Sequence, residues 1–188
     1  MNPISYWQRL KVAFQYAMPQ IYMTQAAGWL AKQKWGAVTH FVIKAFAKKY
    51  NIDMSIAEKE KFSDYASFNE FFIRPLKENA RPINQNPTAL CCPADGRVSE
   101  CGHIEDDRLL QAKGHFFSLN DLLAEDKDLT ETFKNGEFIT TYLSPRDYHR
   151  VHMPCDGTLR KMIYVPGDLL SVNPFLAKHV PNLFARNE

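Results

Sequence analysis

The sequence predicts an α+β protein in which N-terminal amphipathic helices are followed by a mostly antiparallel β domain. Apolar residues recur at helical spacing through the first fifty positions, and from about Thr88 the chain changes to short β-favouring runs separated by Gly, Pro and Asp. The chain has 188 residues, 45% of them hydrophobic, which suits one globular core with a helical attachment. We therefore predict a helical region over residues 1–87 and a β-rich region over residues 88–188.

Three helices are expected in the first fifty residues. Apolar positions at helical spacing mark the first between Trp7 and Ala17, and Pro19 ends it. The same spacing marks the other two over residues 21–30 and 38–46.

Short elements follow along the rest of the chain. The capping-box spellings Ser55-x-x-Glu58 and Ser67-x-x-Glu70 each predict a helix start, and Ser118-x-x-Asp121 predicts one more. Strands are expected in four stretches rich in β-branched and aromatic residues: around Val98, then over residues 109–113, 137–143 and 158–165.

Charge is unevenly distributed, although the net charge of the whole chain is only +2. Residues 1–50 hold seven Lys and Arg residues, all three Trp residues and no Asp or Glu. Basic, aromatic amphipathic helices of this kind lie at membrane surfaces, where each cation contributes about 1 kcal/mol near anionic lipid. A helical bundle with a solvated basic rim is the second interpretation, and nucleic-acid binding a distant third, because no known nucleic-acid module is spelled.

Compartment and membrane topology are indicated by two absences from the sequence. The four cysteines show no C-x-x-C pair and no secreted disulfide framework, so we expect reduced, mostly buried thiols. No signal peptide and no apolar run near the ~18 residues of a spanning helix occurs. A cytosolic protein that does not span the membrane follows.

Two polar segments are candidates for chemistry. The segment 142–157 carries His149 and His152, which titrate near neutrality and could act as general acid or base. The turn Pro93-Ala-Asp95-Gly carries an aspartate that could orient an imidazole, although Asp-Gly is usually only a turn. The spacing His149-x-x-His152-x-x-Cys155 matches no common zinc template, so no metal is expected.

Four motifs in order resemble the bacterial, pyruvoyl-dependent phosphatidylserine decarboxylase family. They are Pro93–Gly96, Tyr142–Gly157, Tyr164–Leu169 and Pro181–Asn187, and the resemblance extends through Ala27–Trp29 and Phe68–Phe72. It implies a proenzyme that cuts itself at a Gly-Ser bond and converts the serine into a pyruvoyl cofactor on the smaller chain. Residues 88–188 would then be the N-terminal part of the decarboxylase domain.

The resemblance also implies roles for individual residues. Asp95 would orient His149, which would deprotonate the cleavage-site serine, and His152 would protonate the substrate carbon after decarboxylation. Ser171 is the candidate for a hydrogen bond to the lipid phosphate. Phosphatidylserine would form a Schiff base with the pyruvoyl group, lose carbon dioxide and leave as phosphatidylethanolamine.

The implied partners are phosphatidylserine, anionic membrane lipid and the pyruvoyl-bearing small chain of the same proenzyme. Homo-oligomerisation is left open, and no nucleic acid is expected. The implied location is peripheral, on the cytoplasmic face of the bacterial cell membrane.

No Gly-Ser dipeptide occurs in the 188 residues. We expect the chain to stop before the cleavage site, so that the activity belongs to the complete gene product and this fragment alone is inactive. The alternatives are a non-catalytic anionic-lipid-binding protein and a metal hydrolase that uses His149, His152 and Cys155.

Overall fold

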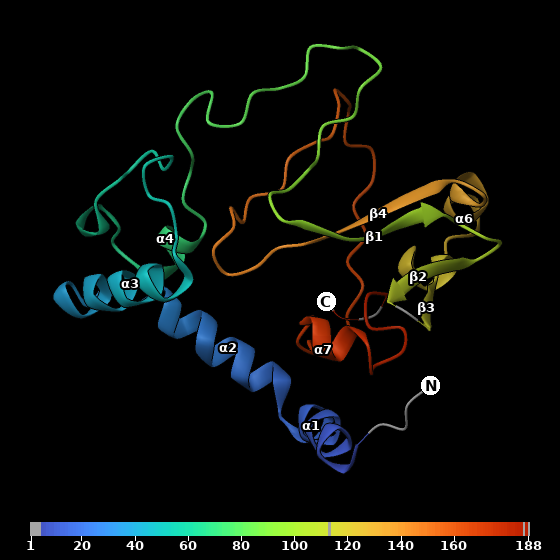
Figure 1. The fold of residues 1–188 in the computed structure, drawn as a ribbon, viewed down its shortest axis with the longest axis horizontal. Coiled ribbons are helices and arrows are strands. Elements are labelled where there is room, and N and C mark those ends of the chain that lie inside the picture. The colour runs from blue at the N-terminus through green and yellow to red at the C-terminus, as the bar shows by residue number, and fades with distance from the viewer. Residues whose placement is uncertain (1–4, 113, 186, 188) are drawn as a thin grey trace. The chain divides into compact units, whose positions relative to one another are not determined.

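The computed structural model describes residues 5–112, 114–185 and 187, and Figure 1 shows the order of their elements. The chain forms two compact units, each assembled from separated stretches of sequence. Unit 1 contains Met1–Thr24, Val98–Thr140 and Lys161–Glu188, and unit 2 contains Gln25–Arg97 and Thr141–Arg160. Helices precede small sheets along the chain, which confirms the α+β class. The predicted boundary at residue 88 stays a prediction.

The first two helices are α1 (Tyr6–Ala17) and α2 (Gln20–Ala31), as their apolar spacing predicted. A capping box starts α1, since the Ser5 hydroxyl accepts from the Gln8 amide and the Gln8 side chain accepts from the Ser5 amide. Within the described residues neither helix has a buried side chain, so their aromatic residues are not the core of a bundle. The exposed aromatic residues are Tyr6, Trp7, Phe14, Tyr16, Tyr22 and Trp29.

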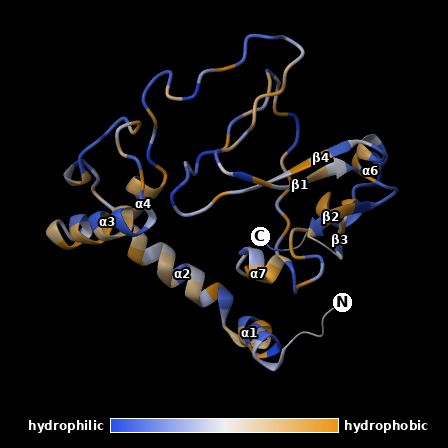
Figure 2. Cartoon of the chain, viewed as in Figure 1, coloured by the Kyte–Doolittle hydropathy of each residue, from blue (hydrophilic) through white to orange (hydrophobic). Residues whose placement is uncertain are grey.

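The third helix, α3 (Ala37–Tyr50), packs with one face and leaves another open. Ile43 and Ala47 are buried, whereas Phe41 and Val42 are exposed. Figure 2 shows hydrophobic and hydrophilic residues mixed around both α1 and α3. Among the helices of the described residues, none combines the length and the hydropathy needed to cross a bilayer.

The core of unit 2 forms where α3 meets the short helices η1 (Phe62–Asp64) and α4 (Phe68–Phe72). Phe71 is fully buried there and contacts several aromatic rings edge-on, including Tyr65 with centroids 5.6 Å apart. The Tyr65 hydroxyl donates to the Lys59 carbonyl at 2.6 Å, which satisfies its polar end inside the core.

The two predicted capping boxes differ in outcome. Ser67 caps α4 as predicted, accepting from the Glu70 amide at 3.2 Å. The predicted helix start at Ser55 is wrong, because Asp53 accepts from both the amide and the hydroxyl of Ser55 and holds the chain in a turn.

The strands form two small sheets. The first pairs β1 (Arg97–His103) with β4 (Glu137–Tyr142), and the second pairs β2 (Arg108–Ala112) antiparallel to β3 (His115–Ser118). Three of the four predicted strand regions are therefore present, with Lys113 outside the described residues. The prediction for residues 158–165 is wrong, because that stretch forms no ladder with another described segment and most of it is exposed.

The remaining helices all lie in unit 1. Ser118 caps α5 (Leu119–Leu122) as predicted, whereas α6 (Lys127–Phe133) and α7 (Pro174–Ala177) were not predicted. Buried Gln111 ties strand β2 to the α7 region, donating to the Ala177 carbonyl at 2.9 Å and to the Val180 carbonyl at 2.7 Å.

Candidate functional site

The aspartate turn of unit 2 lies between the segment that follows α4 and strand β1. Asp95 accepts hydrogen bonds from Arg81, with Nε 2.9 Å from Oδ1 and 3.1 Å from Oδ2, and Nη2 2.5 Å from Oδ2. Gly96 follows and lies so close to the end of strand β4 that an added Cβ would stand 2.5 Å from the Tyr142 carbonyl oxygen. Only glycine allows the turn to approach that strand.

A tight turn starts the histidine segment. The Asp147 carboxylate accepts from the Ser144 amide at 2.6 Å and from the Ser144 hydroxyl at 2.7 Å. The Asp147 amide donates back to the Ser144 carbonyl at 2.9 Å. Short Ser and Asp side chains favour such local bonds, and Pro145 between them pre-sets the turn. Tyr148 and His149 leave this turn in fixed directions.

His149 is half-buried against helix α4. Its ring stacks on Phe72 with centroids 4.1 Å apart and planes 24° from parallel. Its Nε2 lies 3.1 Å from the Ser144 carbonyl oxygen, which can only accept, so Nε2 carries the hydrogen and Nδ1 is the basic nitrogen. Burial, followed by the charge of Arg74, lowers the pKa of His149, despite opposing effects of the Ser144 bond and Asp147. The ring is therefore held in its neutral, basic form near neutral pH.

His152 lies beside the aspartate turn. Its backbone amide donates to the Pro93 carbonyl at 2.8 Å, and the Cys91 amide donates to the Pro154 carbonyl, also at 2.8 Å. The ring stacks on Tyr148, and His152 Nε2 lies 2.9 Å from the Tyr148 hydroxyl. The two polar segments singled out from the sequence thus run side by side.

The end of helix α4 supports the histidine segment through three consecutive residues. Phe72 stacks on His149, as described above. The carbonyl of Ile73 accepts from Arg150 Nε at 2.7 Å, and Arg74 Nη2 donates to the Arg146 carbonyl at 3.2 Å.

Arg74 is a buried cation at the base of a cleft. It is 2% exposed, and among the described residues its Nε and Nη1 have no hydrogen-bond partner. Burial lowers the pKa of Arg74, partly offset by Tyr65, Asp95 and Asp147. The cleft has a volume of roughly 270 Å³. Its lining residues are Asn51, Asp53, Ile56, Arg74, Arg81, Asp95, Arg146, Asp147 and Tyr148.

The residues predicted from the sequence have different surroundings. Asp95, His149 and His152 share unit 2, but Asp95 is paired with Arg81, and neither histidine is hydrogen-bonded to it in the described structure. Ser171 belongs to unit 1, where its hydroxyl accepts from Asn173 Nδ2 at 2.9 Å.

Four contacting residues were not predicted: Phe72, Arg74, Arg81 and Tyr148. The sequence offered one signal for the arginines, since each directly precedes a proline. No sequence pattern indicates that Arg81 contacts Asp95, which lies 14 positions further along the chain.

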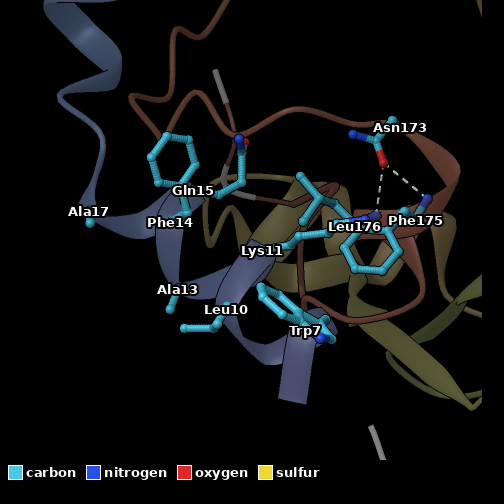
Figure 3. Close-up of a pocket in the computed structure, with 10 residues that line it drawn as sticks. All are labelled: Trp7, Leu10, Lys11, Ala13, Phe14, Gln15, Ala17, Asn173, Phe175 and Leu176. Carbon is cyan, nitrogen blue, oxygen red and sulfur yellow. Dashed lines mark hydrogen bonds between the residues drawn. The ribbon is translucent and has the colours of Figure 1, made fainter. Parts of the chain in front are cut away.

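Unit 1 contains an apolar groove of roughly 760 Å³ between α1 and α7 (Figure 3). Trp7, Leu10 and Phe14 line it from α1, and Phe175 and Leu176 from α7. Asn173 caps α7, accepting from the amides of Phe175 and Leu176 at 3.0 Å each (Figure 3). The Lys11 ammonium lies 5.7 Å from the centre of the Phe175 ring, which places a cation at the groove.

The cysteines are free thiols in the part of the chain that the structure describes, but the prediction that most are buried is wrong. Cys92, Cys101 and Cys155 are exposed, because they lie in turns and on a small sheet. Within the described ranges no three His, Cys, Asp or Glu side chains gather in an arrangement that could hold a metal ion.

Unit 2 holds the Asp95 carboxylate and the imidazoles of His149 and His152, and its cleft is lined by three arginines, three aspartates and one tyrosine. Carboxylates and imidazoles are groups typical of proton-transfer enzymes. Comparison with known proteins identifies the family of the chain. The phosphatidylserine decarboxylase family model matches residues 68–188, and a second model described as PSD matches residues 10–51. The chain belongs to the phosphatidylserine decarboxylase family.

Similar curated proteins are named phosphatidylserine decarboxylase proenzyme. The protein of Haemophilus influenzae is 88% identical over 188 residues, which cover all of this chain and 65% of that relative. The protein of Pasteurella multocida is 80% identical over 185 residues, 98% of this chain and 63% of the relative. The chain therefore spans a little under two thirds of the length of these relatives.

Proposed function

We propose that the complete protein decarboxylates phosphatidylserine to phosphatidylethanolamine at a membrane surface, using a pyruvoyl group made from one of its own serines. The observation that carries the proposal is the backbone bond from His152 to Pro93, which brings the histidine segment beside the Asp95 turn. The proenzyme name carried by relatives 88% and 80% identical supports a chain that is processed.

The residues of unit 2 suit the proton transfers that this chemistry needs. A bound pyruvoyl group supplies an electrophilic carbonyl that accepts electrons as carbon dioxide leaves. The chain supplies an ionisable carboxylate at Asp95 and two imidazoles at His149 and His152, one half-buried and one bonded to a tyrosine hydroxyl. These are the donor and acceptor types that general acid–base catalysis uses.

His149 is our candidate for the base that takes the proton of the cleavage-site serine. Its lowered pKa keeps it neutral, and its Nδ1 is free of the bond that Nε2 makes to Ser144. For Asp95 to orient this imidazole, its carboxylate accepts the Nε2 hydrogen in place of the Ser144 carbonyl when the complete site assembles, which leaves Nδ1 as the base. His152 delivers a proton to the substrate carbon after carbon dioxide has left.

An assignment in which His149 and His152 exchange these roles is a second candidate, favoured by one contact. The backbone of His152, and not that of His149, is bonded to the aspartate turn. In this assignment His152 is the self-cleavage base and His149 the acid of the decarboxylation step. Each assignment gives one histidine to self-cleavage and the other to decarboxylation. The two steps are measured separately, so the assignments can be separated by experiment.

Unit 1 has features that suit a lipid substrate. The groove between α1 and α7 is apolar along its walls, with Lys11 beside Phe175. Exposed aromatic residues of α1, with Tyr22 at the start of α2, add surface suited to the headgroup layer of anionic lipid. We propose a peripheral location on the cytoplasmic face of the membrane, with Ser171 as a hydrogen-bond donor to the lipid phosphate.

The test uses the complete gene product, purified as the parent and as His149→Ala and His152→Ala variants. Intact mass reports self-cleavage, and conversion of phosphatidylserine in mixed micelles reports decarboxylation. His103→Ala is the matched control, because His103 lies in unit 1 and pairs on the surface with Glu137.

Each outcome has a defined meaning. The parent and the control should give two chains, the smaller one blocked by pyruvoyl, and should form phosphatidylethanolamine. An uncut His149→Ala variant with a cut but inactive His152→Ala variant supports the first assignment, and the reverse supports the second. A single uncut chain in the parent would overturn the proposal and leave a non-catalytic anionic-lipid-binding protein as the better interpretation.

A further inference from the structure

Arg81 holds the Asp95 carboxylate from one side. Its Nε contacts both carboxylate oxygens at 2.9 and 3.1 Å, and its Nη2 contacts Oδ2 at 2.5 Å. The third nitrogen, Nη1, donates to the Ala80 carbonyl at 2.8 Å. The guanidinium is therefore fixed both to the carboxylate and to the carbonyl of the preceding residue, and it cannot rotate without breaking several bonds at once.

The carboxylate retains capacity for a further partner. An ionised carboxylate has about four lone-pair sites, and Arg81 directs three contacts at Asp95, two of them from one nitrogen. Oδ1 receives a single contact at 2.9 Å. A histidine N–H can therefore share the carboxylate with Arg81 and need not displace it.

The charge of Arg81 is permanent. Hydrogen bonding to Asp95 raises the pKa of Arg81 further above its already high ordinary value, so the cation persists at every working pH. A fixed cation on Asp95 reduces how strongly the same carboxylate stabilises an imidazolium. The other charged groups that line this cleft are Arg74, Arg146, Asp53 and Asp147.

We propose that Arg81 is a positioning residue for self-cleavage: it fixes the orientation of the Asp95 carboxylate, so that a histidine that bonds to Asp95 in the complete site stays in its neutral, basic form. The inference rests on the proposed role of Asp95. Arg81 itself touches neither the serine nor the substrate in this role.

Two independent features support this role over that of an ordinary surface ion pair. The two cations Arg81 and Lys77 are similarly exposed, but the Asp95 carboxylate is only 24% exposed and the Glu60 carboxylate of the Lys77 pair is 56% exposed, so the orientation of Asp95 is the more restricted. The bond also joins two segments that meet at the site, the Ala80–Arg81 stretch and the aspartate turn. Residues that hydrogen-bond to a metal ligand typically affect activity about 10–100-fold, and we expect an effect of similar size for Arg81 on Asp95.

The experiment follows self-cleavage of the freshly synthesised complete gene product between pH 5.5 and 9. It compares Arg81→Ala, Arg81→Lys and Asp95→Ala with the parent. Lys77→Ala is the matched control, because it removes one cation and one ion pair from the same unit. Methylguanidinium is added to the Arg81→Ala variant as a chemical rescue.

Arg81→Ala is expected to cut roughly 10–100-fold more slowly, with the half-maximal rate shifted to higher pH, because the histidine then protonates more readily. Arg81→Lys should recover part of the rate, and methylguanidinium should partly restore the Ala variant. Lys77→Ala should match the parent. A loss caused only by misfolding would lower the rate at all pH values without a shift and without rescue, and it would overturn the inference.

The Asp95→Ala variant also separates the inference about Arg81 from the proposed role of Asp95 in self-cleavage. If Asp95→Ala is not cut and Arg81→Ala behaves as the parent, Asp95 keeps its role and the inference about Arg81 fails. If Asp95→Ala itself is cut at the parental rate, the proposed role of Asp95 fails, and the inference fails with it.

Discussion

Replacing Gly96 by alanine tests the close approach that brings the aspartate turn to the strand end. The new Cβ would stand 2.5 Å from the Tyr142 carbonyl oxygen and 2.9 Å from Thr141 Cγ2, although real Cβ atoms essentially never lie within 3.0 Å of another atom. The nearer obstacle is backbone, so it cannot rotate aside. The turn must therefore move by at least about 0.5 Å to clear the oxygen.

The expected size of the effect follows from that displacement. Forcing an extra methyl group into a packed site costs about 1–3 kcal/mol of folding free energy. A misplacement of about 1 Å in a catalytic arrangement can cost roughly a hundredfold in rate. Because Asp95 is the neighbouring residue, Gly96→Ala should slow self-cleavage about tenfold to a hundredfold.

The assay follows the appearance of the two chains by intact mass over time, beside urea unfolding of the uncut precursor. Gly28→Ala is the control, because an added Cβ at Gly28 meets nothing within 4 Å and Gly28 lies in the same unit. Parental cleavage and stability in Gly96→Ala would refute the argument from close approach. Reduced stability with a parental cleavage rate would show that the turn and the chemistry are not coupled.

Three further predictions follow from other contacts. Phe72→Ala exposes the His149 ring and should raise its pKa toward the ordinary value of 6.5, as ring-proton NMR titration will measure; an unchanged pKa would mean that Phe72 does not bury the ring. Because the folded pKa of His149 is lowered, the unfolded chain binds this proton first. Stability should therefore be lost as pH falls from 6.5 through the folded pKa, and Phe72→Ala should weaken that dependence. Lys44→Ala should weaken binding to vesicles containing anionic lipid about fivefold, equivalent to about 1 kcal/mol, with no change on zwitterionic vesicles; equal loss on both would exclude a charge effect. Gln111→Leu leaves two buried carbonyls without donors and should cost about 2–4 kcal/mol in urea unfolding, unlike exposed Gln85→Leu; equal midpoints would show that water replaces the lost bonds.

Local signals in the sequence predicted the elements whose causes are themselves local. The helix over Tyr6–Ala17 depends on its own apolar spacing and on the capping box between Ser5 and Gln8. Both causes lie within or next to the helix. The Ser55 and Ser67 spellings look alike, yet only Ser67 begins a helix. The difference is Asp53, which binds the Ser55 hydroxyl before a cap can form. Whether a capping motif starts a helix thus depends on neighbouring side chains that compete for its hydrogen bonds, as well as on its own residues.

Residues 158–165 show the limit of strand prediction. Their β-branched and aromatic content reflects a preference for a half-buried pleated surface, but a strand also needs a neighbouring strand to bond with. Within the described chain no such ladder forms, and Leu159, Met162 and Tyr164 are exposed.

Only the part of the candidate site that depends on local sequence could be predicted. The segment that contains His149 and His152 was identified from its unusual residue types, whereas Asp95 became a candidate mainly through the family resemblance. Arg81 was not identified, because its contact with Asp95 depends on how a stretch 14 residues earlier folds back. Such pairings belong to tertiary structure and leave no periodic pattern in the chain.

The division of unit 2 into two stretches of sequence has a consequence for how the protein is made. The bond from Arg74 to the Arg146 carbonyl spans 72 residues, and that from Arg150 to the Ile73 carbonyl spans 77. The first stretch must therefore leave the ribosome long before its partner exists, and such distant contacts form slowly because a large loop has to close first. Synthesis adds about 5–20 residues each second, so His149 and His152 are made several seconds after the aspartate turn. Until the second stretch has been made, the contacts that join the two stretches of unit 2 cannot form.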